Sequence, residues 1–163
     1  MKLLDRTIAE LSRLEPDHRP VLQKLVLELL NHAVWAPNHR LREPWRFIFV
    51  PRVEAEKMEL LSHEAGAHLI IASQNDSDPY KQNENTAAVF CLVQNFQLLA
   101  YERGMGVNVI FREWMYDSVA CRKLGVTGKE KITAVLELGF GVEPPGAAST
   151  RPEWPADLNW SRL

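Results

Sequence analysis

Ala33-Val-Trp-Ala-Pro-Asn-His-Arg-Leu-Arg-Glu-Pro-Trp-Arg-Phe-Ile-Phe-Val50 joins a predicted helix to a predicted strand through a loop of unusual composition. The loop is bounded by two prolines, Pro37 and Pro44. Because a proline disfavours helical geometry in the residue before it, the preceding helix should end near Trp35. Pro44 cannot donate a ladder hydrogen bond, and it therefore suits the entrance to a strand. The apolar run that follows predicts a short, fully buried strand over residues 47–50.

Between the prolines the loop carries a cluster of polar and charged side chains, namely Asn38, His39, Arg40, Arg42 and Glu43. A simple linker needs none of these groups, whereas a pocket for a flat, anionic, hydrogen-bonding ligand could use all of them. The cations should lie at the rim of the sheet, where open sheets tend to bind ligands. A plainer interpretation is equally open, in which the prolines and tryptophans only pack against the core and the arginines face solvent.

The composition is that of an ordinary globular domain and argues against several classes of function. The chain has 163 residues, of which 46% are hydrophobic and 25% charged, and one domain is predicted over residues 1–163. A net charge of -2 without a basic cluster argues against nucleic acid as a partner. No apolar run reaches the roughly 20 residues that span a bilayer, so no membrane partner is expected. Cys91 and Cys121 lack metal-binding spacing and are expected to be reduced, which favours a cytoplasmic location.

Helical and strand patterns alternate along the chain. Helices are predicted over residues 2–14, 20–35, 53–62, 86–102 and 117–124. Strands are predicted over residues 46–51, 67–73, 107–111 and 132–140, and the polar stretch 74–85 is predicted to be a loop. This interleaving indicates a layered α/β or α+β domain.

The helix predicted over residues 86–102 is apolar on nearly every side. Such a helix is normally buried, and burying it in so small a domain would require a second subunit. The tail, residues 141–163, contains Trp154 and Trp160 but has no clear periodicity. Because two exposed tryptophans would be costly, the tail is predicted to be an arm that packs on the domain or on the partner subunit.

Other patterns that could carry chemistry are weak. His63 and His68, with Glu64 between them, are five residues apart rather than the four of a zinc-binding helix, which separates them by about 140° around the helix axis. No metal site is therefore predicted, and a metal hydrolase is only a third alternative. No nucleophile elbow is present. Of the histidines, His39 is the candidate for a functional site because it lies in the rigid loop.

On these residues the sequence resembles the nitroreductase family, the FMN-dependent NAD(P)H oxidoreductases. Segment 36–47 is similar to the family pattern of Ala-Pro, a short polar run, Gln or Glu, then Pro-Trp and a strand. It matches best a small subgroup with Asp/Asn-His-Lys/Arg after Ala-Pro. Residues 87–106 resemble the long central helix of the family, and residues 132–140 resemble its last core strand. The resemblance covers residues 20–145.

The resemblance implies a nitroreductase-like α+β fold, with a central mixed or antiparallel sheet flanked by helices. It also implies a homodimer with FMN at the subunit interface. By matching position, Asn38, His39 and Arg40 would line the flavin site, with Trp35 beside them. NAD(P)H would be the co-substrate, and electrons would pass through the flavin to a nitro compound, a quinone or a similar small-molecule acceptor. No catalytic side chain is expected, because the cofactor carries the chemistry.

Two departures from the family pattern leave an alternative open. Family members usually begin with an Arg-Arg-Ser/Thr motif that grips the FMN phosphate, and the candidates here are Arg6 and Thr7, which follow Asp5. Arg112 is the candidate for a second family cation, after the strand that follows the central helix. The alternative function is therefore a non-catalytic protein that keeps this fold, binds FMN weakly or not at all, and acts as a binding or interaction module.

Overall fold

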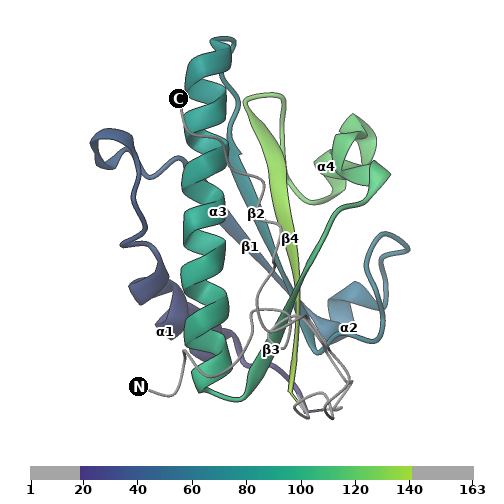
Figure 1. The fold of residues 1–163 in the computed structure, drawn as a ribbon. Helices are drawn as coiled ribbons and strands as arrows, with labels where there is room; N and C mark the ends of the chain where they lie inside the picture. The colour runs from purple at the N-terminus through teal and green to yellow at the C-terminus, as the bar shows by residue number, and fades with distance from the viewer. Residues whose placement is uncertain (1–18, 141–163) are drawn as a thin grey trace, which may run out of the picture.

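The computed structural model describes residues 19–140, which form a four-stranded antiparallel sheet with helices on both faces (Figure 1). Along the chain the elements are α1 (Gln23–Ala33), η2 (His39–Leu41), β1 (Trp45–Pro51), α2 (Arg52–Ala55), β2 (Ala67–Gln74), α3 (Pro79–Glu102), β3 (Met105–Ile110), η3 (Glu113–Tyr116), α4 (Ser118–Lys123) and β4 (Glu130–Phe140). The strands lie in the order β1-β2-β4-β3. The predicted α+β class is confirmed. The predicted helix 2–14, the residues Arg6 and Thr7, and the predicted arm 141–163 lie outside the described residues.

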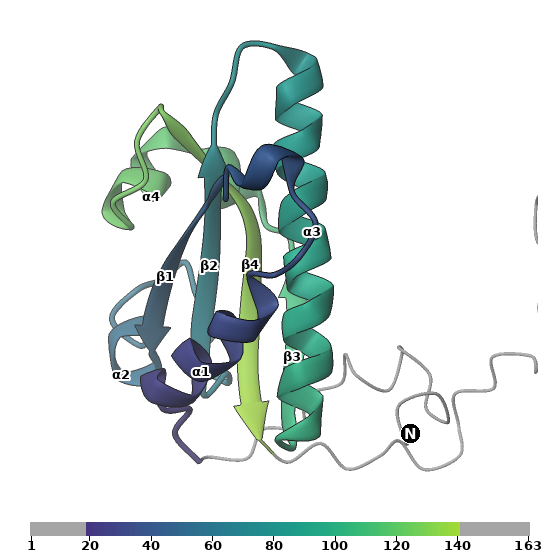
Figure 2. The same ribbon diagram turned by 90° about the vertical axis from the view of Figure 1, so that its left-hand side faces the viewer.

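The helices divide between the two faces of the sheet. In the turned view α3 lies on one side of the strands and α4 on the other (Figure 2), and the two core clusters place α1 with α3 and α2 with α4. The division follows from alternation along β2, because successive side chains of a strand point to opposite faces. Leu69 and Ile71 belong to the core under α1 and α3, whereas Ile70 and Ala72 belong to the core under α2 and α4. The predicted buried strand 67–73 is thus confirmed as a central strand, buried on both faces.

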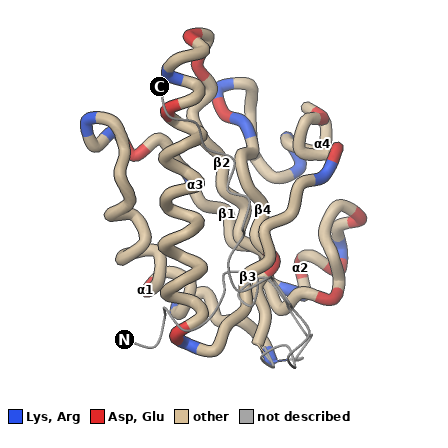
Figure 3. Tube along the Cα trace, in the orientation of Figure 1, with Lys and Arg blue, Asp and Glu red and all other residues tan. Residues whose placement is uncertain are grey.

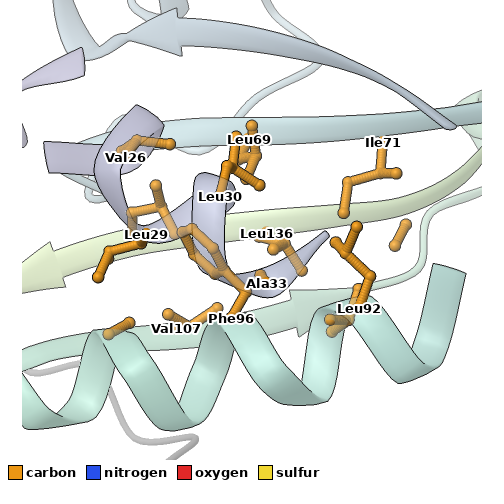
Figure 4. Packing of buried hydrophobic residues seen from close by; sticks show 14 of the residues in the cluster. Val26, Leu29, Leu30, Ala33, Leu69, Ile71, Leu92, Phe96, Val107 and Leu136 are labelled. Atoms are coloured by element: carbon orange, nitrogen blue, oxygen red, sulfur yellow. The ribbon is translucent and has the colours of Figure 1, made fainter. Parts of the chain in front are cut away.

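The larger core lies between the sheet and the helices α1 and α3 (Figure 4). The ring of Phe96 is fully buried there, between α1 and the strands. Helix α1 contributes Val26, Leu29, Leu30 and Ala33, which are spaced as one helical face. Its last residue, Ala33, lies close to the end predicted from Pro37. The predictions of a helix over 20–35 and of strands over 107–111 and 132–140 are confirmed with small shifts of their bounds.

The start of α3 corrects the predicted loop 74–85. The helix begins at Pro79, where proline is tolerated because a first-turn amide needs no helical partner. The side chain of Asp78 accepts a hydrogen bond from the Tyr80 amide and caps the helix. The first two turns are polar because they extend beyond the sheet, so they carry no apolar stripe. The predicted loop is therefore reduced to residues 75–78.

Two further predictions are wrong in detail. β1 was expected to be fully buried, but it pairs only with β2 and is an edge strand, so Phe47, Ile48 and Phe49 are only half-buried. The helix expected over residues 53–62 is confined to α2, and turns follow it. The inward-facing apolar residues of that segment do pack on the second core, and such packing does not require a helix.

A salt bridge ties the edge strand to β4 across β2. The Arg46 guanidinium donates to both carboxylate oxygens of Glu130, at 2.8 and 2.6 Å, and to the carbonyl of Gly125 at 3.0 Å. The bidentate contact raises the pKa of Arg46 and lowers the pKa of Glu130. The contacts of Arg46 with Glu130 and Gly125 stabilise the end of the sheet at which β1 begins.

His68 is a buried polar residue without a hydrogen-bond partner. It lies near the start of β2, has no exposed surface, and neither ring nitrogen is bonded. Burial, with a smaller contribution from the charge of His63, lowers the pKa of His68 from 6.5 to about 4. Glu137 is its register partner on β4, but the Glu137 carboxylate accepts from the Asn108 amide at 3.0 Å. His68 is therefore held neutral at physiological pH.

Candidate functional site

The polar loop 38–44 lies at the end of the sheet where β1 begins and β2 ends, as the sequence predicted. The carbonyl of Pro44 accepts a hydrogen bond from the Gln74 amide at 2.9 Å, which fixes the loop to the end of β2. The other wall is the first turns of α3. The loop and the helix enclose a shallow depression of about 260 Å³, lined by His39, Arg40, Arg42, Asp78, Tyr80, Lys81 and Glu84. Figure 3 shows that basic residues gather at the outer tip of this loop.

The backbone of the loop is strained. Arg40, Leu41 and Glu43 have φ of 55°, 54° and 46°, in the left-handed region that residues other than glycine rarely adopt. Each such residue costs about 1–3 kcal/mol and persists only where the surroundings over-determine its conformation. Strain of this kind is concentrated at ligand sites and switches. The loop backbone therefore marks this end of the sheet as a candidate functional site.

The side chain of Asn38 forms two hydrogen bonds that stabilise the loop. Its side-chain amide donates to the carbonyl of Ala36 at 3.2 Å, and its side-chain oxygen accepts from the Glu43 amide at 3.1 Å. One side chain thus links the two ends of the loop. The sequence predicted that Asn38 lines the ligand site, and the structure shows that both its donor and its acceptor hold the loop conformation.

Glu84 of α3 contacts two side chains of the loop. Its carboxylate lies 3.0 Å from a terminal nitrogen of Arg42 and 3.4 Å from Nδ1 of His39. The Glu84 side chain is 22% exposed, and those of Arg42 and His39 are 39% and 47% exposed. Pairs this exposed contribute at most about 1 kcal/mol to folding stability. Their main effect is to orient both side chains and to offset the charge of Arg42.

Arg40 and Trp35 remain open to solvent. Within residues 19–140, the Arg40 side chain forms no hydrogen bond or ion pair, so its charge is available to a ligand. Trp35 is 83% exposed, Leu41 is 78% exposed and Tyr80 is 72% exposed. Large exposed apolar side chains are typical of surfaces that a ligand or another protein covers. Of the predicted residues, His39 and Arg40 line the depression together with Tyr80, whereas Trp35 lies beyond the end of α1 and is not among the lining residues.

Arg112 is not brought to this cluster within one chain. It follows β3, which is the other edge strand, so β2 and β4 separate it from β1. Its side chain is exposed, and its backbone amide lies 3.3 Å from the sulfur of Met115. β3 runs toward the end of the sheet at which β1 begins, but its last residue, Ile110, is level with Ile48 in the middle of β1. Arg112 therefore shares no pocket with the loop in one chain.

Four residues of the site, namely Asp78, Tyr80, Lys81 and Glu84, were not predicted, because residues 74–85 were interpreted as a loop. Tyr80, Lys81 and Glu84 all lie on the first turns of α3. The pair Asp78-Pro79 is a helix-start signal that could have placed them on a helix.

A second hollow, of about 470 Å³, lies on the α4 side of the sheet. Its walls include Met115, Cys121, Val126 and Ile132, and it contains none of the residues predicted for the site. Burial raises the pKa of the Cys121 thiol, which disfavours the reactive thiolate. The hollow therefore offers no activated nucleophile.

The pair His63 and His68 has no metal-binding geometry. His68 points from β2 into the protein core, whereas His63 is exposed in the preceding turn. Among residues 19–140, no group of three or more His, Cys, Asp or Glu side chains could hold a metal ion. In the same part of the chain, no helix is both long and apolar enough to cross a bilayer.

Comparison with known proteins gives consistent likenesses. No protein-family model matches the sequence. The chain is 29% identical over 157 residues to the Bacillus subtilis protein named "Putative NAD(P)H nitroreductase YfhC". The alignment covers 82% of this chain and 81% of that protein. The fold resembles a nitroreductase-like family protein from Bacillus cereus, with a TM-score of 0.74, 27% identity, and coverage of 88% and 89% of the two chains. It also resembles a Bacteroides fragilis nitroreductase with bound FMN, with a TM-score of 0.70, 17% identity, and 95% coverage of each chain.

Proposed function

We propose that the chain is an oxidoreductase of the nitroreductase family, whose members it resembles in sequence and fold, and that it binds FMN and passes electrons from NAD(P)H to a nitro compound, a quinone or a similar acceptor. The fold that the sequence predicted, nitroreductase-like, is confirmed by the structures it resembles. The observation that carries the proposal is the strained loop 38–44, which presents an unpaired Arg40 in the same depression as the exposed ring of Tyr80.

The side chains of the depression fit a flat, anionic group. Arg40 supplies a positive charge, and the exposed ring of Tyr80 supplies a flat apolar surface. The side chains of His39 and Arg42 add nitrogen donors at the loop wall. Bound FMN would supply the electron transfer, accepting hydride from the nicotinamide and passing electrons on. The protein would bind and orient the flavin, and no side chain need move a proton.

The size of the depression indicates that other residues complete the site. Small-molecule pockets usually have volumes of roughly 300–1,000 Å³, whereas the depression has about 260 Å³. A second subunit would supply the missing walls and would cover Trp35, Leu41 and Tyr80. We therefore include the homodimer in the proposal. Sedimentation equilibrium should give twice the chain mass of 18.6 kDa, and a monomer mass in the presence of FMN would contradict it.

The rate of NADH or NADPH oxidation tests the proposed activity. Protein supplied with FMN should oxidise NADH or NADPH when a quinone or a nitroaromatic compound is present, and the rate should exceed that of free FMN at the same concentration. The physical reason is that a bound flavin is held in position for hydride transfer. A rate equal to that of free FMN, with both nucleotides and both classes of acceptor, would favour the alternative of a non-catalytic binding module.

A further inference from the structure

Glu84 is the side chain that connects the strained loop to a rigid helix. Its carboxylate reaches Arg42 at 3.0 Å and His39 at 3.4 Å, across a sequence separation of more than forty residues. It lies on the second turn of α3, and the next residue, Asn85, is buried and donates to the Gln74 carbonyl at 3.2 Å. The position of Glu84 is therefore fixed by the helix and the sheet, and not by the loop.

The other contacts that shape the loop are made by the loop itself or at its end. Asn38 links the Ala36 carbonyl to the Glu43 amide, and Nε of Arg42 lies 3.4 Å from the His39 carbonyl. The Gln74 amide holds only the carbonyl of Pro44. Among the described residues, Glu84 alone contributes a side-chain hydrogen bond or ion pair to the loop from outside it.

The two contacts of Glu84 flank the strained residues. His39 precedes and Arg42 follows the two consecutive left-handed residues, Arg40 and Leu41. A carboxylate that holds both neighbours toward α3 keeps the backbone between them in its left-handed conformation. It also offsets the charge of Arg42, so that Arg40 is the loop arginine that is open to an anionic ligand.

We propose that Glu84 is a positioning residue for the flavin-binding loop, which holds His39 and Arg42 against α3 so that Arg40 is presented to the ligand. This inference rests on the proposed function, because it assumes that the loop binds FMN. A loop fixed in its binding conformation loses less conformational entropy when the ligand binds. The contribution of Glu84 therefore appears in ligand affinity and in local order, and only weakly in global stability.

Three variants test the inference. Glu84→Ala should weaken FMN binding about tenfold, a modest preorganisation effect, speed amide hydrogen exchange at Arg40 and Leu41, and leave the unfolding temperature nearly unchanged. Glu84→Gln should have a smaller effect, because its amide oxygen can still accept from Arg42. Glu102→Gln is the matched control, since Glu102 is exposed on the same helix about 27 Å away along the axis. It should behave as the unaltered protein does.

A mutant cycle separates positioning from a general structural role. If Glu84 acts through His39 and Arg42, then Glu84→Ala should change FMN affinity less than twofold in a chain that already carries His39→Ala and Arg42→Ala. An undiminished effect of Glu84→Ala in that chain would overturn the inference, and so would unchanged loop exchange in Glu84→Ala.

The exchange experiment uses the protein without flavin, so it separates two kinds of failure. If the unaltered protein binds no FMN, the proposed function fails, while faster loop exchange in Glu84→Ala would still support the positioning of the loop. If the unaltered protein binds FMN and Glu84→Ala binds it equally well, the positioning role is overturned and the proposed function stands.

Discussion

The double substitution His39→Ala, Arg40→Ala is expected to weaken FMN binding by about a hundredfold. A hydrogen bond to a charged group contributes about 1.5–3 kcal/mol and one between neutral groups about 0.5–1.5 kcal/mol. The loss of one of each, near 3 kcal/mol in total, corresponds to about two orders of magnitude in the dissociation constant. Titration of the protein with FMN, followed by quenching of flavin fluorescence, measures the effect. Both side chains are exposed, so the fold should be retained.

Arg122→Ala is the control for this experiment. Arg122 is an exposed arginine on α4, on the opposite side of the sheet from α3, and its loss should leave FMN affinity unchanged. Arg40→Lys should keep part of the affinity, because it keeps the charge but loses the planar fork of donors. Unchanged FMN binding by the double variant would remove the loop from the flavin site.

Acidification is expected to remove about 3 kcal/mol of folding stability through His68 alone. The folded protein holds this ring neutral with a pKa near 4, whereas the unfolded chain has a pKa near 6.5. Between these values the unfolded state binds more protons, so stability falls as the pH falls. The contribution is fully present above pH 6.5 and is lost progressively toward pH 4. Urea unfolding measured across this window gives the slope.

The matched variant for this slope is His68→Leu, which fills the site without a titrating group. Carboxylates also titrate in acid, so the test is the difference between the pH slopes of the two proteins. Leucine also removes two buried nitrogens that lack partners, so the variant should be at least as stable as the unaltered protein near pH 4. Equal slopes for the two proteins would show that His68 is not held neutral in the fold.

Sequence patterns predicted the elements that are buried and failed where burial is partial. β2 is covered on both faces, and its continuous apolar run correctly predicted a fully buried strand. The run in β1 is equally apolar, yet β1 is an edge strand, because an apolar run does not show whether both neighbours are present. The first turns of α3 extend beyond the sheet and carry polar residues, so periodicity gave no signal there.

Some residues of the candidate site could be predicted from the sequence, and others could not. The loop could be recognised from its own residues, because Pro37, Pro44 and the cations between them are local in sequence. The role of Glu84 could not, because its contacts depend on where α3 crosses the end of the sheet. The position of Arg112 after β3 was predictable, but its separation from the loop depends on the strand order. Local chemistry was therefore predictable, and the partners that tertiary packing supplies were not.

The absorbance spectrum of the purified protein, recorded after incubation with FMN and removal of the excess, is the first measurement of whether the loop binds flavin. We expect a retained flavin band, close to one flavin per chain, because the loop presents Arg40 to the ligand. A colourless protein would show that the loop does not hold FMN, and this chain would then keep a nitroreductase fold for a function without flavin.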